Sequence, residues 1–172
     1  LADLDTPLAT FLKVDDGSTA FLFESGEGGD WGRFSFIGVG ARARLRCQGG
    51  TLEIERRGQT RRIPLSGDHR EDPLVHLRAL LDELRPAKLE GLPRFSGGAV
   101  GYLAYDWVRY VERLPEVCRD SLGVPDCLFA FPETLLVHDR VLQRLSLIHI
   151  AELDGFADAD AAWAEGVARL DA

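Results

Sequence analysis

Residues 41 to 65 constrain the fold most strongly, because polar and apolar side chains alternate there through three short runs. The runs read ARARLRCQ, TLEIERRG and QTRRIPL, with Gly49-Gly50 after the first run and Gly58-Gln59 as the second turn. A period of two is typical of a strand that buries one face. Glycine also supplies the left-handed backbone that two-residue hairpin turns require. The pattern therefore predicts a three-stranded antiparallel meander.

The two turns also predict which residues face each other. A turn at Gly49-Gly50 sets apolar residues opposite apolar ones and arginine opposite glutamate. These pairs are Gln48 with Thr51, Cys47 with Leu52, Arg46 with Glu53, Leu45 with Ile54, and Arg44 with Glu55. A turn at Gly58-Gln59 places Ile54 opposite Ile63 and Glu55 opposite Arg62. Because glutamates interleave with the arginines, we interpret the polar face as solvated rather than as a polyanion site.

The rest of the chain adds strands and a few helices. Asp72 and Pro73 are a typical helix cap and first residue, and leucines at helical spacing follow them until Pro86. Further strands are expected over 19–25, 33–39 and 95–105, a hairpin over 127–138 and 141–150 joined at Asp139-Arg140, a short helix over 106–112 and another over 157–170. A glycine-rich loop should cover 26–32. The fold class expected is α+β, a mostly antiparallel sheet with helices packed on it.

Composition and motifs exclude several functions. The net charge of −8 argues against general affinity for nucleic acid, and no apolar run is long enough to cross a membrane. The three cysteines have no CxxC spacing, which fits a reducing cytoplasm. Gly38 to Ala43 spells the outline of a dinucleotide-binding loop, but the next residues alternate like a strand, so we reject nucleotide binding there. Methionine is absent and the chain starts at Leu1, so we expect a part of a longer protein.

Three blocks carry a resemblance to a known family. They read DLDTPLATFLK at 3–13, FLFESGEGGDWGRFSFIG at 21–38 and PRFSGGAVGYLAYDWVRYVE at 93–112. Together they resemble the N-terminal domain of the large subunit of anthranilate synthase (component I), in order and with similar spacing. The resemblance makes residues 1–172 one N-terminal regulatory domain. It implies that the catalytic, chorismate-binding domain lies outside this chain.

The resemblance also implies a reaction and its partners. The large subunit of that family converts chorismate to anthranilate and pyruvate in tryptophan biosynthesis, with ammonia from a glutamine amidotransferase subunit, component II. It uses Mg²⁺, whose ligands belong to the C-terminal domain and therefore lie outside this chain. We accordingly expect residues 1–172 alone to be inactive and to hold no catalytic or metal-binding residue.

The same family binds L-tryptophan as a feedback inhibitor in its N-terminal domain. Its Leu-Leu-Glu-Ser signature matches Leu22-Phe23-Glu24-Ser25, with Phe23 in place of the second leucine. The resemblance marks Ser25, Glu24 and Leu22 as ligand-binding residues, and Arg33 as the basic residue near the ligand. A free amino acid needs an acceptor, a donor and an apolar slot, which such residues can supply.

Two other functions stay open at this point. The first is the same domain of aminodeoxychorismate synthase or of another chorismate-using enzyme, although Val108-Arg109-Tyr110 resembles anthranilate synthase more closely. The second is a non-catalytic, β-rich interaction module. The glycines at 97, 98 and 101 favour a core strand closely approached by a neighbouring element over direct ligand contact.

Overall fold

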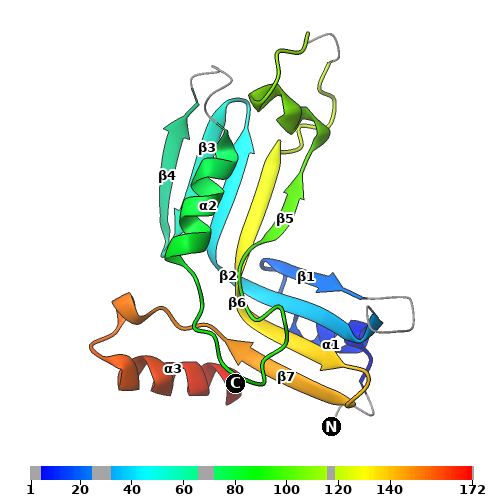
Figure 1. Ribbon diagram of the computed structural model, residues 1–172, viewed down its shortest axis with the longest axis vertical. Helices are drawn as coiled ribbons and strands as arrows, with labels where there is room; N and C mark the ends of the chain where they lie inside the picture. The colour runs from blue at the N-terminus through cyan, green and yellow to red at the C-terminus, as the bar shows by residue number, and fades with distance from the viewer. Residues whose placement is uncertain (1–4, 25–31, 66–71, 116–118, 172) are drawn as a thin grey trace. The chain divides into compact units, whose positions relative to one another are not determined.

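The computed structural model describes residues 5–24, 32–65, 72–115 and 119–171. They form two compact units (Figure 1). The first unit comprises Leu1–Ala41, Pro86–Gly97 and Pro132–Ala172, and the second comprises Arg42–Arg85 and Gly98–Phe131. Two long strands, β2 (Phe34–Gln48) and β6 (Cys127–Asp139), contribute residues to both units. The assignment of residues 1–172 to one domain stays a prediction.

The second unit contains the meander. Its strands lie in the order β4 (Gln59–Pro64), β3 (Thr51–Arg56), β2, β6 and β5 (Val100–Leu103). Leu45 lies opposite Ile54 and Cys47 opposite Leu52, and the other three pairs predicted for the first turn are also present. The register that follows from a turn at Gly49-Gly50 is confirmed, and so is the α+β class. β2 runs through Gly38 and Gly40 as a strand, which agrees with the rejection of a nucleotide-binding loop.

The register predicted across the second turn was wrong. Ile54 lies opposite Arg61, and Ile63 lies opposite Leu52, because the turn is formed by Arg57 and Gly58. Both residues have left-handed backbones, with φ of 51° and 71°. That conformation at both central positions is the one that matches the twist of a hairpin. An arginine in this conformation is uncommon, so the sequence favoured a turn one residue later.

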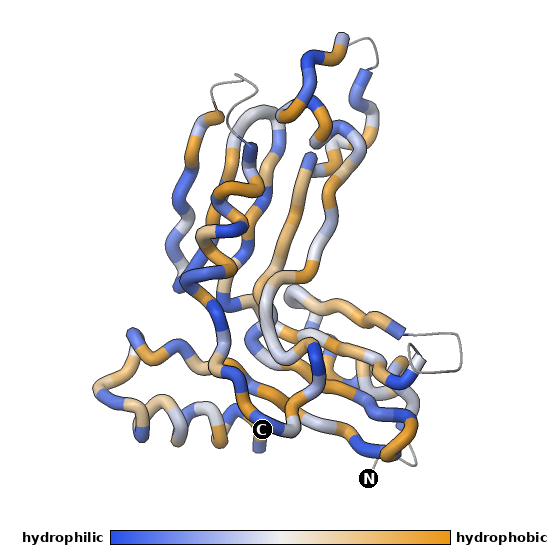
Figure 2. Tube along the Cα trace, viewed as in Figure 1, coloured by the Kyte–Doolittle hydropathy of each residue, from blue (hydrophilic) through white to orange (hydrophobic). Residues whose placement is uncertain are grey.

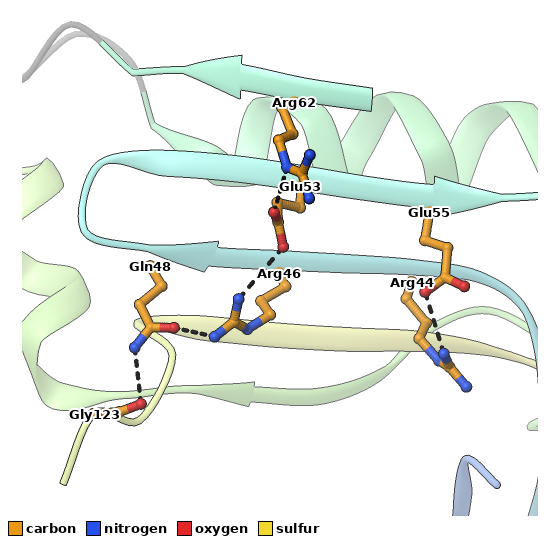
Figure 3. Close-up of polar contacts among 7 residues, drawn as sticks. All are labelled: Arg44, Arg46, Gln48, Glu53, Glu55, Arg62 and Gly123. Atoms are coloured by element: carbon orange, nitrogen blue, oxygen red, sulfur yellow. Dashed lines mark hydrogen bonds and ion pairs between the residues drawn. The ribbon is translucent and has the colours of Figure 1, made fainter. Parts of the chain in front are cut away.

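The polar face of the meander carries ion pairs between arginine and glutamate (Figure 3). Arg46 with Glu53 and Arg44 with Glu55 are pairs that the sequence predicted, whereas Arg62 pairs with Glu53 and not with Glu55, which lies opposite Thr60. Glu53 accepts from Arg62 at 2.8 Å and from Arg46 at 3.4 Å, and Glu55 accepts from Arg44 at 3.2 Å. The pairs are substantially exposed, so each contributes only about 0.2–1 kcal/mol. These ion pairs therefore favour one register of β2, β3 and β4 over others, and add little to the free energy of unfolding.

The apolar face of the meander is covered by α2 (Pro73–Glu83). Asp72 caps this helix by accepting from the Leu74 amide at 2.8 Å, as expected. Along α2 hydrophobic and hydrophilic residues alternate in the manner of an amphipathic helix (Figure 2). The core of the second unit consists of Ala43, Leu45, Cys47, Leu52, Leu77, Leu80, Leu84, Cys127 and Phe131. The helix therefore packs on β2 and β3 through its leucines.

The strand expected over 95–105 is shorter than predicted, since β5 covers Val100–Leu103. A short 3₁₀ helix, η2 (Tyr105–Tyr110), follows it. Gly101 lies against the neighbouring strand so closely that a Cβ there would be 1.9 Å from the Leu128 carbonyl oxygen. The glycine is thus required by close approach of another backbone, the interpretation favoured from sequence.

The first unit contains β1 (Ala20–Phe23), which pairs with the start of β2, and β7 (Arg144–His149), which pairs with the end of β6. The hairpin connection is longer than predicted, because Asp139 lies opposite Arg144. The predicted C-terminal helix is present as α3 (Ala159–Asp171), after a short 3₁₀ turn, η3 (Leu153–Gly155). No helix in the described part of the chain is long and apolar enough to span a bilayer.

α1 (Pro7–Val14), in the first unit, was not predicted from the sequence. Thr6 caps it by accepting from the Ala9 amide at 3.1 Å, and Pro7 occupies its first turn. A threonine followed by proline is the same kind of signal that identified α2 at Asp72-Pro73. The signal was therefore available in the sequence.

Replacing Gly101 by alanine should destabilise the protein by about 1–3 kcal/mol, because the new methyl group must push β5 away from β6. Urea unfolding followed by circular dichroism measures this change. Gly155→Ala is the matched control, since nothing lies within 4 Å of a Cβ at that position. Equal unfolding midpoints for the two variants would contradict the close packing at Gly101.

Candidate functional site

The residues that the resemblance marks lie in the first unit, and two of them share one end of a strand pair. β1 and β2 are antiparallel with Phe23 opposite Phe36, so the end of β1 lies beside the start of β2. Glu24 follows β1 directly and is exposed, and Arg33 precedes β2 directly. Leu22 lies within β1 opposite Ile37 and is half-buried. Ser25 and residues 26–31 of the expected loop lie outside the described residues.

Arg33 is held by the carboxylate of Asp139, a contact that no sequence pattern reveals. Its Nε donates to Asp139 Oδ1 at 2.9 Å and to Oδ2 at 3.0 Å, and its NH2 group donates to Oδ2 at 2.5 Å. The guanidinium also lies 4.8 Å from the centre of the Phe34 ring. This forked contact is stronger and better oriented than a single charge contact. Arg33 therefore has a fixed position, and its role in ligand binding stays a prediction.

Asp139 also organises the loop that follows β6. Its Oδ1 accepts from the Val141 amide at 3.0 Å and from the Leu142 amide at 3.1 Å. The Arg33 guanidinium holds the pKa of Asp139 below its usual value, and these backbone amides act in the same direction. The Arg140 amide donates to the Arg33 carbonyl at 3.0 Å, which ties this loop to the start of β2. Asp139 is thus an ionised residue that joins two strand ends.

His138, next to Asp139, connects the same strand end to α1. Its Nε2 is 3.0 Å from Thr10 Oγ1, and the two residues are only 4% and 6% exposed. Burial lowers the pKa of His138, while the nearby carboxylates of Asp5 and Glu24 act in the opposite direction. Glu24 is therefore close enough for its charge to reach His138. The hydroxyl of Ser35, also fully buried, has no hydrogen-bond partner within the described parts of the chain.

Aromatic side chains provide apolar surface beside these charges. The rings of Phe21 and Phe23 are 5.2 Å apart, and Phe36 contacts Phe34 at 6.1 Å and Phe95 edge-on at 5.6 Å. Phe23, which immediately precedes Glu24 in the sequence, is 52% exposed. A half-exposed ring offers a surface on which an apolar group of a ligand can pack.

These groups suit a small zwitterion with an apolar side chain. Glu24 can accept a hydrogen bond from an ammonium group, Arg33 can donate hydrogen bonds to a carboxylate, and Phe23 offers an aromatic face. Among the residues that the structure describes, no group of three or more His, Cys, Asp and Glu could hold a metal ion. The arrangement can bind and orient a ligand, and we assign it no chemical step.

A second polar cluster, in the other unit, has a structural explanation. Tyr110 donates to Asp126 at 2.8 Å and accepts from the Gly50 amide at 3.3 Å and from the Cys47 thiol at 3.2 Å. Burial raises the pKa of Tyr110, and contact with Cys47 raises that of Cys127. Cys47 and Cys127 are buried, free thiols. Tyr110 thereby anchors η2 to the turn between β2 and β3, which explains the tyrosine of the Val-Arg-Tyr pattern.

We predict that the free energy of unfolding falls as the pH drops below about 6.5, the pKa of an exposed histidine. Because the folded-state pKa of His138 is lowered, the unfolded chain binds more protons there as the pH falls. His138→Gln should reduce this slope, as measured by urea unfolding at pH 7.5, 6.5 and 5.5. Thr10→Val is the control: it removes the hydrogen bond but leaves His138 buried, so stability drops at every pH while the slope persists. An unchanged slope in His138→Gln would exclude His138 as its source.

This chain is similar in sequence to known proteins over almost its whole length. No family model matches it. The Pseudomonas putida protein named anthranilate synthase component 1 is 38% identical over 99% of this chain and 34% of its own length. The Thermus thermophilus protein of that name is 42% identical over 96% of this chain and 34% of its own length. The Acetivibrio thermocellus protein of that name is 35% identical, covering 90% and 30%.

A solved structure agrees in fold. Anthranilate synthase component I from Streptococcus pneumoniae superimposes with a TM-score of 0.61 at 21% identity, covering 98% of this chain and 34% of that one. The chain thus spans about a third of the length of the curated relatives it matches. It is homologous to the anthranilate synthase component 1 proteins over about one third of their length.

Proposed function

We propose that this chain is the tryptophan-sensing, N-terminal part of an anthranilate synthase component 1 that works in the cytoplasm. The complete protein would convert chorismate to anthranilate and pyruvate with ammonia from a glutamine amidotransferase subunit, component II. Its own C-terminal domain would supply the catalytic residues and the Mg²⁺ ligands. Identity of 35–42% with proteins of that name, over 90–99% of this chain, supports the assignment.

One observation carries the regulatory part of this proposal. β1 ends at Phe23, within the Leu22-Phe23-Glu24-Ser25 sequence, and the antiparallel pairing with β2 places that strand end at the start of β2, which Arg33 precedes. Glu24 would accept from the ammonium group of tryptophan, Ser25 would offer its hydroxyl or amide, and Arg33 would face the carboxylate. Leu22 would contribute to the apolar surface around the indole ring.

The energies of such contacts are of the order that a metabolite sensor requires. Burying about 200 Å² of indole contributes on the order of 5 kcal/mol at about 25 cal/mol per Å². Micromolar binding requires about 8 kcal/mol. Two or three charge-assisted hydrogen bonds, worth about 1.5–3 kcal/mol each, would have to supply the difference and offset the cost of ordering the ligand. Tryptophan would inhibit by binding the less active arrangement of the enzyme more tightly and shifting the population toward it.

Substituting Ser25 by phenylalanine in the complete enzyme should weaken inhibition by tryptophan at least tenfold, because a phenyl ring fills the space that the ligand needs. The measurement is the tryptophan concentration that halves anthranilate formation, with activity in the absence of tryptophan close to that of the parent enzyme. Ser18→Phe is the matched control: it introduces the same ring at an exposed serine that precedes β1. Equal tryptophan sensitivity of the Ser25 variant, the Ser18 variant and the parent enzyme would count against the proposed site.

A further inference from the structure

Asp139 makes more contacts than a loop-forming aspartate requires. Two backbone amides, those of Val141 and Leu142, already satisfy Oδ1 in the manner of a turn. Its carboxylate nevertheless also receives three close contacts from the Arg33 guanidinium, at 2.5 to 3.0 Å. Asp120 provides a comparison, because it accepts from the amides of Leu122 and Gly123 at 3.0 and 2.9 Å. The contact with Arg33 is thus an addition to an ordinary turn.

The pair is asymmetric in its exposure to solvent. The Asp139 side chain is 11% exposed, whereas that of Arg33 is 36% exposed. A buried, ionised carboxylate, whose pKa is lowered by the guanidinium beside it, therefore holds a cation that still reaches the surface. The Phe34 ring supports the same guanidinium at 4.8 Å. An arginine side chain has many rotamers, and these contacts limit it to one direction.

Arg33 is also held at the strand end that carries Glu24. The start of β2 is tied to the loop after β6 by the bond from the Arg140 amide to the Arg33 carbonyl. The same strand adjoins the end of β1, where Glu24 is exposed. A ligand with an ammonium group on Glu24 would therefore find a pre-oriented cation nearby. Pre-orientation raises affinity because less freedom is lost when the ligand binds.

We propose that Asp139 is a positioning residue that orients Arg33 toward the carboxylate of an α-amino acid bound at Glu24. The inference rests on the proposed function and extends it to a residue on β6. Asp139 itself does not touch the ligand. It acts through Arg33, so its loss should affect ligands that carry a carboxylate and spare those that lack one.

The test compares L-tryptophan with tryptamine, which has the same indole and ammonium groups but no carboxylate. Both are titrated by calorimetry into the complete protein that carries this sequence, and into its Asp139→Asn variant. The substitution should weaken L-tryptophan at least tenfold and tryptamine less than twofold, so the ratio of the two affinities falls at least fivefold. In the double variant with Arg33→Ala, the loss for L-tryptophan should not exceed that of Arg33→Ala alone.

Matched variants separate positioning from general damage. Asp120→Asn changes a similar turn aspartate and should leave both affinities unchanged. Asp139→Glu keeps the negative charge and serves as the second variant if Asp139→Asn does not fold. We expect Asp139→Glu to lower the ratio of the L-tryptophan and tryptamine affinities as well, with a change in its logarithm about half that caused by Asp139→Asn. Equal weakening of both ligands by Asp139→Asn and Asp139→Glu would overturn the inference, because it indicates a structural role.

Two further outcomes are informative. Unchanged or tighter binding of L-tryptophan in both Asp139 variants would overturn the inference while the proposed function stands, since the parent protein still binds the ligand. Failure of the parent protein to bind L-tryptophan at all would reject the proposed function, and the inference with it. A selective loss for the carboxylate-bearing ligand supports both.

Discussion

The hydrogen-bonding demand of β2 is the constraint on which the rest of the structure depends. β2 is fifteen residues long, and backbone amides and carbonyls removed from water must find partners along its length. β1 serves Phe36–Val39, β3 serves Ala43–Gln48, and β6 lies on the other edge. Because β1 pairs with the start of β2, the chain between them must return at that end. This requirement places Glu24 and Arg33 at the same end of the β1–β2 pair.

The parts of the fold that sequence predicted well have local signals. The register at Gly49-Gly50 followed because two glycines allow a single two-residue turn and the flanking residues alternate without interruption. The second turn lacked that clarity, since an arginine in a left-handed conformation has no sequence signature. The start of α2 was recognised from its cap and proline, whereas the similar Thr6-Pro7 was passed over because a helix of eight residues shows little periodicity.

The residues of the proposed site also differ in whether the sequence reveals them. Leu22, Glu24, Ser25 and Arg33 lie within twelve residues of sequence, and a resemblance to known proteins could mark them. The partners that hold the site together come from far along the chain. Asp139 is 106 residues from Arg33, and His138 is 128 residues from Thr10. Neither pair has a period or a spacing to reveal it, because such contacts depend on which strands become neighbours. Asp139 even appeared in the sequence as an ordinary turn residue.

The Arg33–Asp139 pair has a consequence for the choice of ligand under the proposed function. An isolated arginine attracts any anion, including the carboxylates of a substrate such as chorismate. Asp139 cancels most of that charge at longer range, while the guanidinium still offers directed hydrogen bonds at short range. Glu24 adds a negative charge, which would repel a ligand that carries only carboxylates. A zwitterion would instead be attracted through its ammonium group by Glu24 and through its carboxylate by Arg33. The same three side chains would thus favour an amino-acid end product over the acidic substrate of the enzyme that it regulates.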